Sequence, residues 1–163
     1  MAYMPGFKYK TVQVNGKQVK KTDIFEDILK ADVLINVPIA KHHNLAGLTM
    51  GMKNLMGVVK NREIIHFNLH QSLADLSTVI RPTLNVLDAV RILMANGPTG
   101  GNLDDVKKLD TLVASTDIVA LDSYGATLFG KTSKDLPNLG IAAQMGLGIE
   151  DLSQIKVEEL SLN

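Results

Sequence analysis

Alternation of apolar and polar residues predicts a β-hairpin at the start of the chain. Residues 8–14 alternate in polarity, and Asn15-Gly16, a dipeptide typical of two-residue hairpin turns, follows them directly. Residues 17–21 would return as an edge strand, whose lysines discourage pairing with other sheets. A helix capped at position 22 or 23 then runs to about residue 30.

Apolar runs farther along the chain predict the strands of a sheet. Residues 32–37 are almost continuously apolar up to Pro38, as in strands that are buried on both faces of an α/β sheet. Two further strands are predicted at 84–90 and 109–115, and a final edge strand at 155–160. We expect the first three of these segments to share one sheet.

Helical periodicity predicts the elements between the strands. Apolar residues recur at intervals of four, three and four positions at Leu69, Leu73, Leu76 and Ile80. This spacing predicts an amphipathic helix over about 68–80, packed on the sheet, which Arg81-Pro82 ends. A second helix, capped at 116 or 117, runs to about 129, and a third spans about 133–145. Asp122 is expected on the solvated face of the second helix.

The order of these elements predicts the fold class. Strands that alternate with helices indicate a single α/β domain over residues 1–163. We expect a layered sandwich in which helices flank a mixed or mostly parallel sheet. No internal repeat or long linker divides the sequence.

Composition narrows the classes of function without choosing one. Lys and Arg number 17 and Asp and Glu also number 17, so the formal net charge is zero. This balance gives no general attraction to nucleic acid, and no apolar run approaches the ~20 residues of a membrane span. We therefore expect no nucleic-acid and no membrane partner, and the absence of a secretory signal predicts a cytoplasmic protein. Because the sequence has no cysteine, it cannot itself ligate an iron–sulfur cluster.

The first candidate site follows the strand at 32–37. Ligands of open α/β sheets gather beyond the carboxyl ends of the strands, where Lys41 could hold an anion and His42 could move a proton. The alternative is a solvated basic loop whose histidines hydrogen-bond only locally.

A glycine-rich segment at 47–57 offers a second candidate. Lys53 would supply a point charge and Asn54 an orienting amide for an anionic group that the backbone approaches closely. A tightly packed helix is an equal alternative for this pair. For the methionines of the segment, packing into irregular gaps is the preferred interpretation.

Other polar residues could complete a site. Asp88 lies in an apolar strand, where an unpaired carboxylate is costly to bury. We therefore expect it either near the strand's exposed end, where it is a functional candidate, or paired structurally with Arg91 or a loop amide. Asn96 and Gly97 begin a loop that forms an amide nest for an anion or a plain turn. His66 and His70 would share a face of a continuous helix, but without a third ligand we assign no metal site.

An ordered set of segments carries a family resemblance between about residues 31 and 148. The segments are residues 31–38, Lys41-His42, 53–57, His70 with 73–76, 87–89, 96–98 with Gly100, and 117–122. In this order they resemble a bacterial and archaeal family catalogued as domain of unknown function 362. His43 departs from the family's pattern, in which a residue without a titratable group is commoner. Members are often longer, and this chain resembles the later portion of the family domain or a shortened member.

The resemblance implies an α/β domain whose family is associated with iron–sulfur modules and has no assigned activity. We expect an enzyme, or an oxidoreductase domain, that acts on an anionic small molecule. In this hypothesis the catalytic residues are His42, His70 and Asp88, and the substrate-binding residues are Lys41, Lys53, Asn54, Asn96 and Gly97. The cofactor is unknown, and an iron–sulfur module would lie on another chain or an upstream segment.

Alternative functions differ in the geometry they require. A non-catalytic module that binds a metal or phosphate ligand needs converging ligands, whereas an enzyme needs a histidine and a carboxylate within hydrogen-bond reach. A docking domain for an iron–sulfur partner needs an exposed apolar patch. A chain without the family's upstream strand would also leave a sheet edge or face uncovered, which predicts a homo-oligomer.

Overall fold

A five-stranded sheet, a two-stranded sheet and short helices make up the fold. The computed structural model describes residues 4–99 and 101–162. The strands are β1 Tyr9–Gln13, β2 Lys21–Phe25, β3 Ile35–Asn36, β4 Ile39–His43, β5 Gly47–Thr49, β6 Leu84–Leu93 and β7 Val106–Ser115. The α-helices are α1 Glu26–Lys30, α2 Gly51–Asn54, α3 Arg62–His66, α4 Leu69–Leu76, α5 Ile118–Thr127 and α6 Pro137–Gln144. Short 3-10 helices are η1 Gly6–Lys8, η2 Leu55–Val58, η3 Leu103–Asp105, η4 Ser133–Asp135 and η5 Leu152–Gln154.

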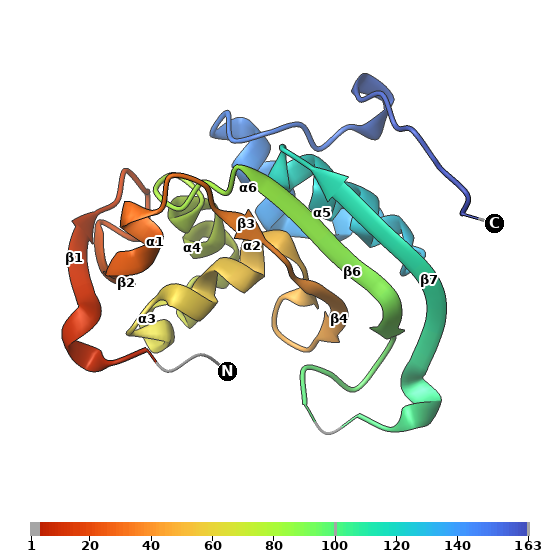
Figure 1. Cartoon of the computed structure of the whole chain (residues 1–163), viewed down its shortest axis with the longest axis horizontal. Helices are drawn as coiled ribbons and strands as arrows, with labels where there is room; N and C mark the ends of the chain where they lie inside the picture. Colours follow the sequence, from red (N-terminus) through yellow and green to blue (C-terminus); the bar gives the residue numbers. More distant parts are fainter. Residues whose placement is uncertain (1–3, 100, 163) are drawn as a thin grey trace.

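The long strand β6 organises the five-stranded sheet. β3 and β4 pair in parallel with successive parts of β6, and β7 pairs with β6 in antiparallel orientation. β5 adds an antiparallel strand beyond β4. Figure 1 shows β6 and β7 running side by side, with α5 and α6 behind them. The mixed sheet flanked by helices confirms the predicted fold class, and the three segments expected to share a sheet do so.

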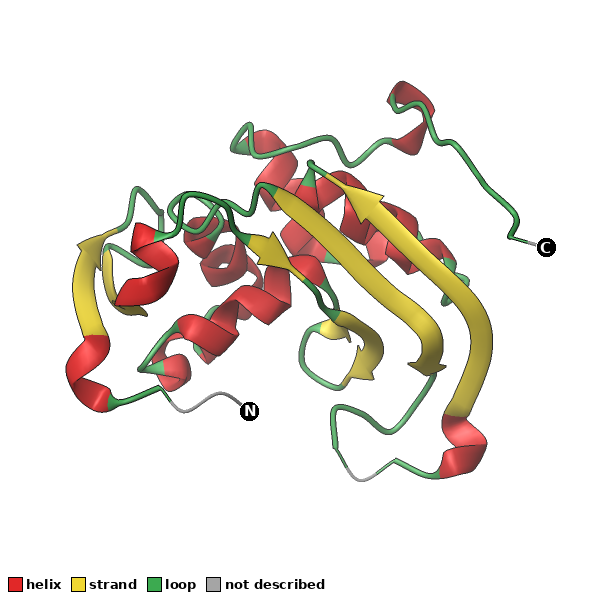
Figure 2. Cartoon of the chain, in the orientation of Figure 1, coloured by secondary structure: helices red, strands yellow, loops and turns green. Residues whose placement is uncertain are grey.

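Helices cover one face of this sheet. Buried and partly exposed residues alternate along most of β6, and no helix of the described residues lies over the face of β6 and β7 that is turned to the viewer in Figure 2. α5 packs on β6 and β7, whereas α4 packs mainly on α6, so the helix predicted at 68–80 has only a minor share in covering the strands. The segment 32–37 is not buried on both faces, because Val33, Ile35 and Val37 are each more than half exposed.

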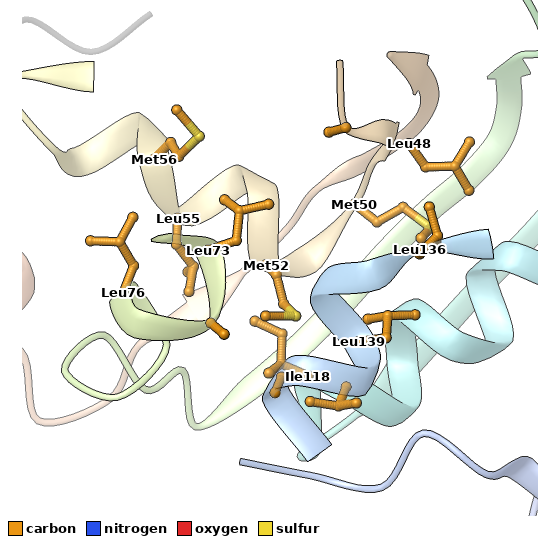
Figure 3. Packing of buried hydrophobic residues seen from close by; sticks show 14 of the residues in the cluster. Leu48, Met50, Met52, Leu55, Met56, Leu73, Leu76, Ile118, Leu136 and Leu139 are labelled. Atoms are coloured by element: carbon orange, nitrogen blue, oxygen red, sulfur yellow. The ribbon is translucent and has the colours of Figure 1, made fainter. Parts of the chain in front are cut away.

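Methionine and leucine side chains fill the core between the helices. Figure 3 shows Met50 and Met52 beside Leu136 and Leu139 at α6, and Leu55 and Met56 beside Leu73 and Leu76 of α4. Met50, Met52 and Met56 are all buried, which confirms that the methionines of the glycine-rich segment serve packing. The flexible thioether side chain suits the gaps of irregular shape between short elements such as α2, η2 and α4.

The N-terminal hairpin forms with a different connection from the one predicted. Tyr9 pairs with Phe25, so residues 14–20 connect the strands instead of a two-residue turn at Asn15-Gly16. The cause is Asp75 of α4, a buried carboxylate that accepts backbone N–H bonds from residues 17, 18 and 19 at 2.9, 2.7 and 2.7 Å. Because β2 uses residues 21–25, the helix predicted from position 22 or 23 begins only at Glu26.

The C-terminal residues depart from the expected edge strand. Residues 155–160 form no strand, and Leu160 is 89% exposed, so alternation in this segment has no face to bury. Tyr124 of α5 donates a hydrogen bond to Glu159 at 2.9 Å, which holds the segment beside the helix. Among residues 4–99 and 101–162, no helix is both long enough and apolar enough to cross a membrane.

Asp122 joins α5 to the start of α2 and is buried, contrary to the solvated position expected. Its carboxylate oxygens accept backbone N–H bonds from Gly51 at 2.6 Å and from Met52 at 2.9 Å. Burial raises the pKa of Asp122 from 3.8 to about 7, although the two hydrogen bonds favour the charged form. A Cβ at position 51 would lie 2.8 Å from Oδ1 of Asp122, so only glycine permits this approach.

We expect Gly16→Ala to lower the free energy of unfolding by about 2–4 kcal/mol, because overpacking against a fixed buried group is costly. A Cβ at Gly16 would lie 2.3 Å from Cγ of Asp75. Gly57→Ala is the matched control, since nothing lies within 4 Å of its Cβ position. Urea denaturation of both variants measures the difference. Equal stabilities of the two variants would show that the loop does not need this close approach.

Asp122 also predicts a dependence of stability on pH. The unfolded chain ionises this carboxyl near 3.8, whereas the folded protein keeps the proton up to about pH 7. The contribution of Asp122 is therefore largest below the unfolded pKa and is lost as the pH rises to the folded pKa. Relative to Asp122→Asn, which does not titrate, we expect wild-type stability to fall by about 3 kcal/mol between pH 4.5 and 7.5. A difference between the two proteins that is constant with pH, measured by urea denaturation, would contradict this assignment.

Candidate functional site

Lys41, His42 and His43 lie in strand β4 and not in the loop that the sequence suggested. Lys41 is in register with Thr49 of β5, and His42 with Leu48. Because successive residues of a strand point to opposite faces, Lys41 and His43 share one face and His42 lies on the other. The strand therefore separates the first candidate site into two regions.

Several basic side chains lie close enough to His43 or Lys53 for their charges to lower the pKa of these two groups. We call them the basic cluster, which consists of Lys41, His43, Lys53, Arg62 and His66. Burial lowers the pKa of Lys53, and the positive charges of Lys41 and Arg62 lower it further. No carboxylate contributes to the pKa shift of Lys53 or His43, and no ion pair of the described residues includes a member of the cluster. The cluster thus has excess positive charge.

Short elements hold the cluster in place. Lys53 lies on α2, whose first turn is fixed by the carboxylate of Asp122. Arg62 begins α3 and donates from Nη2 to the carbonyl oxygen of Gly57 at 2.9 Å, which ties it to the end of the α2–η2 segment. Nδ1 of His66 lies 2.9 Å from the carbonyl oxygen of Arg62.

His43 contributes a neutral imidazole. Its Nδ1 accepts backbone N–H bonds from Leu45 at 3.1 Å and Ala46 at 3.2 Å, so the lone pair is on Nδ1 and the proton of the neutral ring is on Nε2. Burial lowers the pKa of His43 to about 4, and the neighbouring charge of Lys53 acts in the same direction. Near pH 7 the charge of the partly buried part of the cluster therefore comes from Lys41, Lys53 and Arg62.

On the opposite face of β4, His42 meets the loop after β6. Its Nδ1 accepts the backbone N–H of Gly97 at 3.1 Å. Asn96 has a positive φ of 55° and donates from Nδ2 to Asp105 at 2.9 Å, a bond that lowers the pKa of Asp105. The structure thus brings together three predicted site residues, His42, Asn96 and Gly97, and uses polar atoms of each to hold the turn.

The other two predicted catalytic residues contact different elements. Nδ1 of His70, on α4, lies 3.4 Å from Oδ1 of Asn138 on α6. Asp88 accepts the backbone N–H of Val90 on its own strand at 3.0 Å. Since α3 ends at His66 and α4 begins at Leu69, His66 and His70 do not lie on one continuous helix. Among the residues that the structure describes, no three His, Cys, Asp or Glu side chains are grouped to hold a metal.

Asn54, which is itself exposed, is hydrogen-bonded to two buried amides, Asn36 and Asn85, in series. It donates from Nδ2 to Asn36 at 2.8 Å, and Asn36 donates in turn to Asn85 at 3.0 Å. These bonds join α2 to β3 and β6. An asparagine within an apolar strand predicts hydrogen-bonded amides of this kind, because a buried amide requires partners.

Sequence reasoning left three members of the basic cluster outside the site: His43, Arg62 and His66. His43 was set aside because it departs from the family pattern. Arg62 and His66 follow α2, and no motif spacing connects them with Lys41. Only the antiparallel pairing of β4 and β5, followed directly by α2, brings these residues near one another.

Comparisons with known proteins agree with the resemblance. The family model described as "Domain of unknown function (DUF362)" matches residues 1–127, so the match begins and ends earlier than the expected 31–148. The "Thylakoid-associated protein sll1697" of Synechocystis sp. is 28% identical over 131 residues, which are 75% of this chain and 40% of that protein. The chain thus spans about 40% of the length of this relative. With more than half of its residues matched, the chain belongs to the domain of unknown function 362 family.

Proposed function

We propose that this domain binds a small molecule bearing a phosphate or carboxylate group at the basic cluster. The observation that carries the proposal is that Lys41 and Arg62 lie near enough to Lys53 for their charges to lower its pKa, while all three are partly buried and no ion pair of the described residues includes them. Like charges in a partly desolvated site repel one another, and a bound anion would relieve that repulsion. Lysine and arginine side chains are also the usual partners of phosphate.

Two neutral groups at the cluster support an anionic ligand. The Nε2–H of neutral His43 is a hydrogen-bond donor that brings no further charge. The Oγ1 of Thr49, in register with Lys41, is buried and has no hydrogen-bond partner among the described residues. An anion at this position would give the hydroxyl an acceptor, which buried polar groups normally have.

The hydrogen bonds of the histidines favour binding over catalysis. His42 and His43 accept backbone N–H groups, His66 contacts a carbonyl oxygen, and His70 contacts an amide. Within the described part of the chain, none of these bonds joins a histidine to a carboxylate, the pair that an acid–base mechanism would use. The catalytic roles of His42, His70 and Asp88, the redox function and the iron–sulfur partner stay predictions.

We expect Lys53→Gln to weaken the binding of inorganic phosphate about tenfold, since one charge-assisted contact is worth about 1.4 kcal/mol. Isothermal titration calorimetry at constant ionic strength measures the dissociation constants. Lys134→Gln is the matched control, because Lys134 is exposed on η4. Equal weakening by both substitutions would point to general charge attraction, and no phosphate binding by the wild type would reject the proposed site.

The lowered pKa of Lys53 predicts how binding depends on pH. Only the charged lysine attracts an anion, so phosphate affinity should fall as the pH rises through this lowered pKa, before an ordinary lysine with a pKa of 10.5 would lose its proton. Lys53→Arg keeps the charge across this range and should flatten the fall. Titrations from pH 7.5 to 10 provide the comparison. Parallel curves for the two proteins would show that Lys53 does not contribute its charge to binding.

A further inference from the structure

The strand register identifies a row of side chains on the uncovered face of the sheet. Asp88 of β6 is in register with Ile39 of β4 on one side and Leu112 of β7 on the other. Directly paired residues point to the same face. Ile39 and Leu112 are 55% and 65% exposed, so this row faces away from α5 and α6, on the face of β4 that Ile39 shares with Lys41.

Neighbouring rows extend the same apolar surface. Leu84 and Val86 alternate with buried residues of β6, as Asp88 does, and Leu84 is in register with the exposed Ile35. We call the set Ile35, Ile39, Leu84, Val86 and Leu112, with Asp88 among them, the open face. Parallel strands are usually covered on both sides, but here helices cover only the other side of β6 and β7 (Figure 2).

The total surface of the chain is large for its mass. Its accessible surface is 9477 Å², whereas a folded monomer of 17.7 kDa typically exposes about 7,900 Å². The excess of about 1,600 Å² over the whole chain exceeds the ~800 Å² that each partner buries in a standard interface. The open face and the extended residues 155–162 both contribute to this excess surface. The open face therefore accounts for only a part of the excess.

We propose that the open face is an interface between two copies of this chain. An exposed, contiguous apolar surface of this kind marks an association site. A two-fold arrangement would place the same surface on both partners, so apolar residues of one copy would cover those of the other. The zero formal net charge means that two copies do not repel each other overall.

Asp88 would limit the strength of this association. It is the one ionisable residue of the open face as defined above, and the only hydrogen bond of its carboxylate within the described residues is the one it accepts from the N–H of Val90 on its own strand. An ionised carboxylate covered by apolar side chains loses hydration without gaining a partner. The dimer should therefore be reversible, and removal of this charge should strengthen it.

Analytical ultracentrifugation of the whole chain over a range of concentrations tests the proposal. We expect a reversible dimer in the wild type, a dissociation constant raised at least about 30-fold by Leu112→Glu, and one lowered about threefold or more by Asp88→Asn. Asparagine keeps an acceptor for the N–H of Val90. Leu160→Ser is the control, because Leu160 is exposed outside the sheet and should leave the constant unchanged.

A second charged variant guards against misfolding. Ile39→Glu places a charge across Asp88 from Leu112, and circular dichroism shows whether each variant keeps its fold. Dissociation of both folded glutamate variants, with tighter association of Asp88→Asn, would support the proposal. A wild type that stays monomeric at all concentrations, including one that binds a different protein through this face, would overturn it. So would a dimer that none of the open-face substitutions changes.

Discussion

The buried carboxylate of Asp122 is the contact on which the arrangement of the candidate site depends. It accepts hydrogen bonds from the first two residues of α2, Gly51 and Met52, which lie about 70 positions earlier in the chain. Helices as short as α2 are not stable by themselves in water. The position of Lys53 relative to β4 is therefore set by α5, which packs on β6 and β7 and carries Asp122.

The sequence predicted elements whose stability depends on a repeated local pattern. The spacing of Leu69, Leu73 and Leu76 indicated α4, and the apolar runs indicated the strands at 84–90 and 109–115. It did not predict the connection between β1 and β2, because Asp75 determines that loop from a distant helix. Local turn preference at Asn15-Gly16 is worth less than three bonds to a buried carboxylate.

The sequence identified basic residues that could bind an anion, but it did not predict the strand and the neighbouring side chains among which they lie. Lys41 and Lys53 were identified as candidate anion-binding residues, and the structure places both in the basic cluster, where their role stays a prediction. The assignment of Lys41 and His42 to a loop concealed that consecutive strand residues face opposite ways. Arg62 could not be found by spacing, because its position beside Lys53 follows from bonds to backbone carbonyls after α2.

The hydrogen bonds between the N-terminal loop and Asp75 couple the unfolding of this loop to that of α4. A two-stranded hairpin is at best marginally stable alone, and the loop between β1 and β2 receives its main hydrogen bonds from α4. The loop at residues 14–20 therefore loses its main hydrogen bonds when α4 unfolds, so the loop and α4 behave as one unit in local unfolding although some fifty residues separate them in the chain. Amide hydrogen exchange at residues 17–19 would then report the opening of α4 and not the fraying of the hairpin itself.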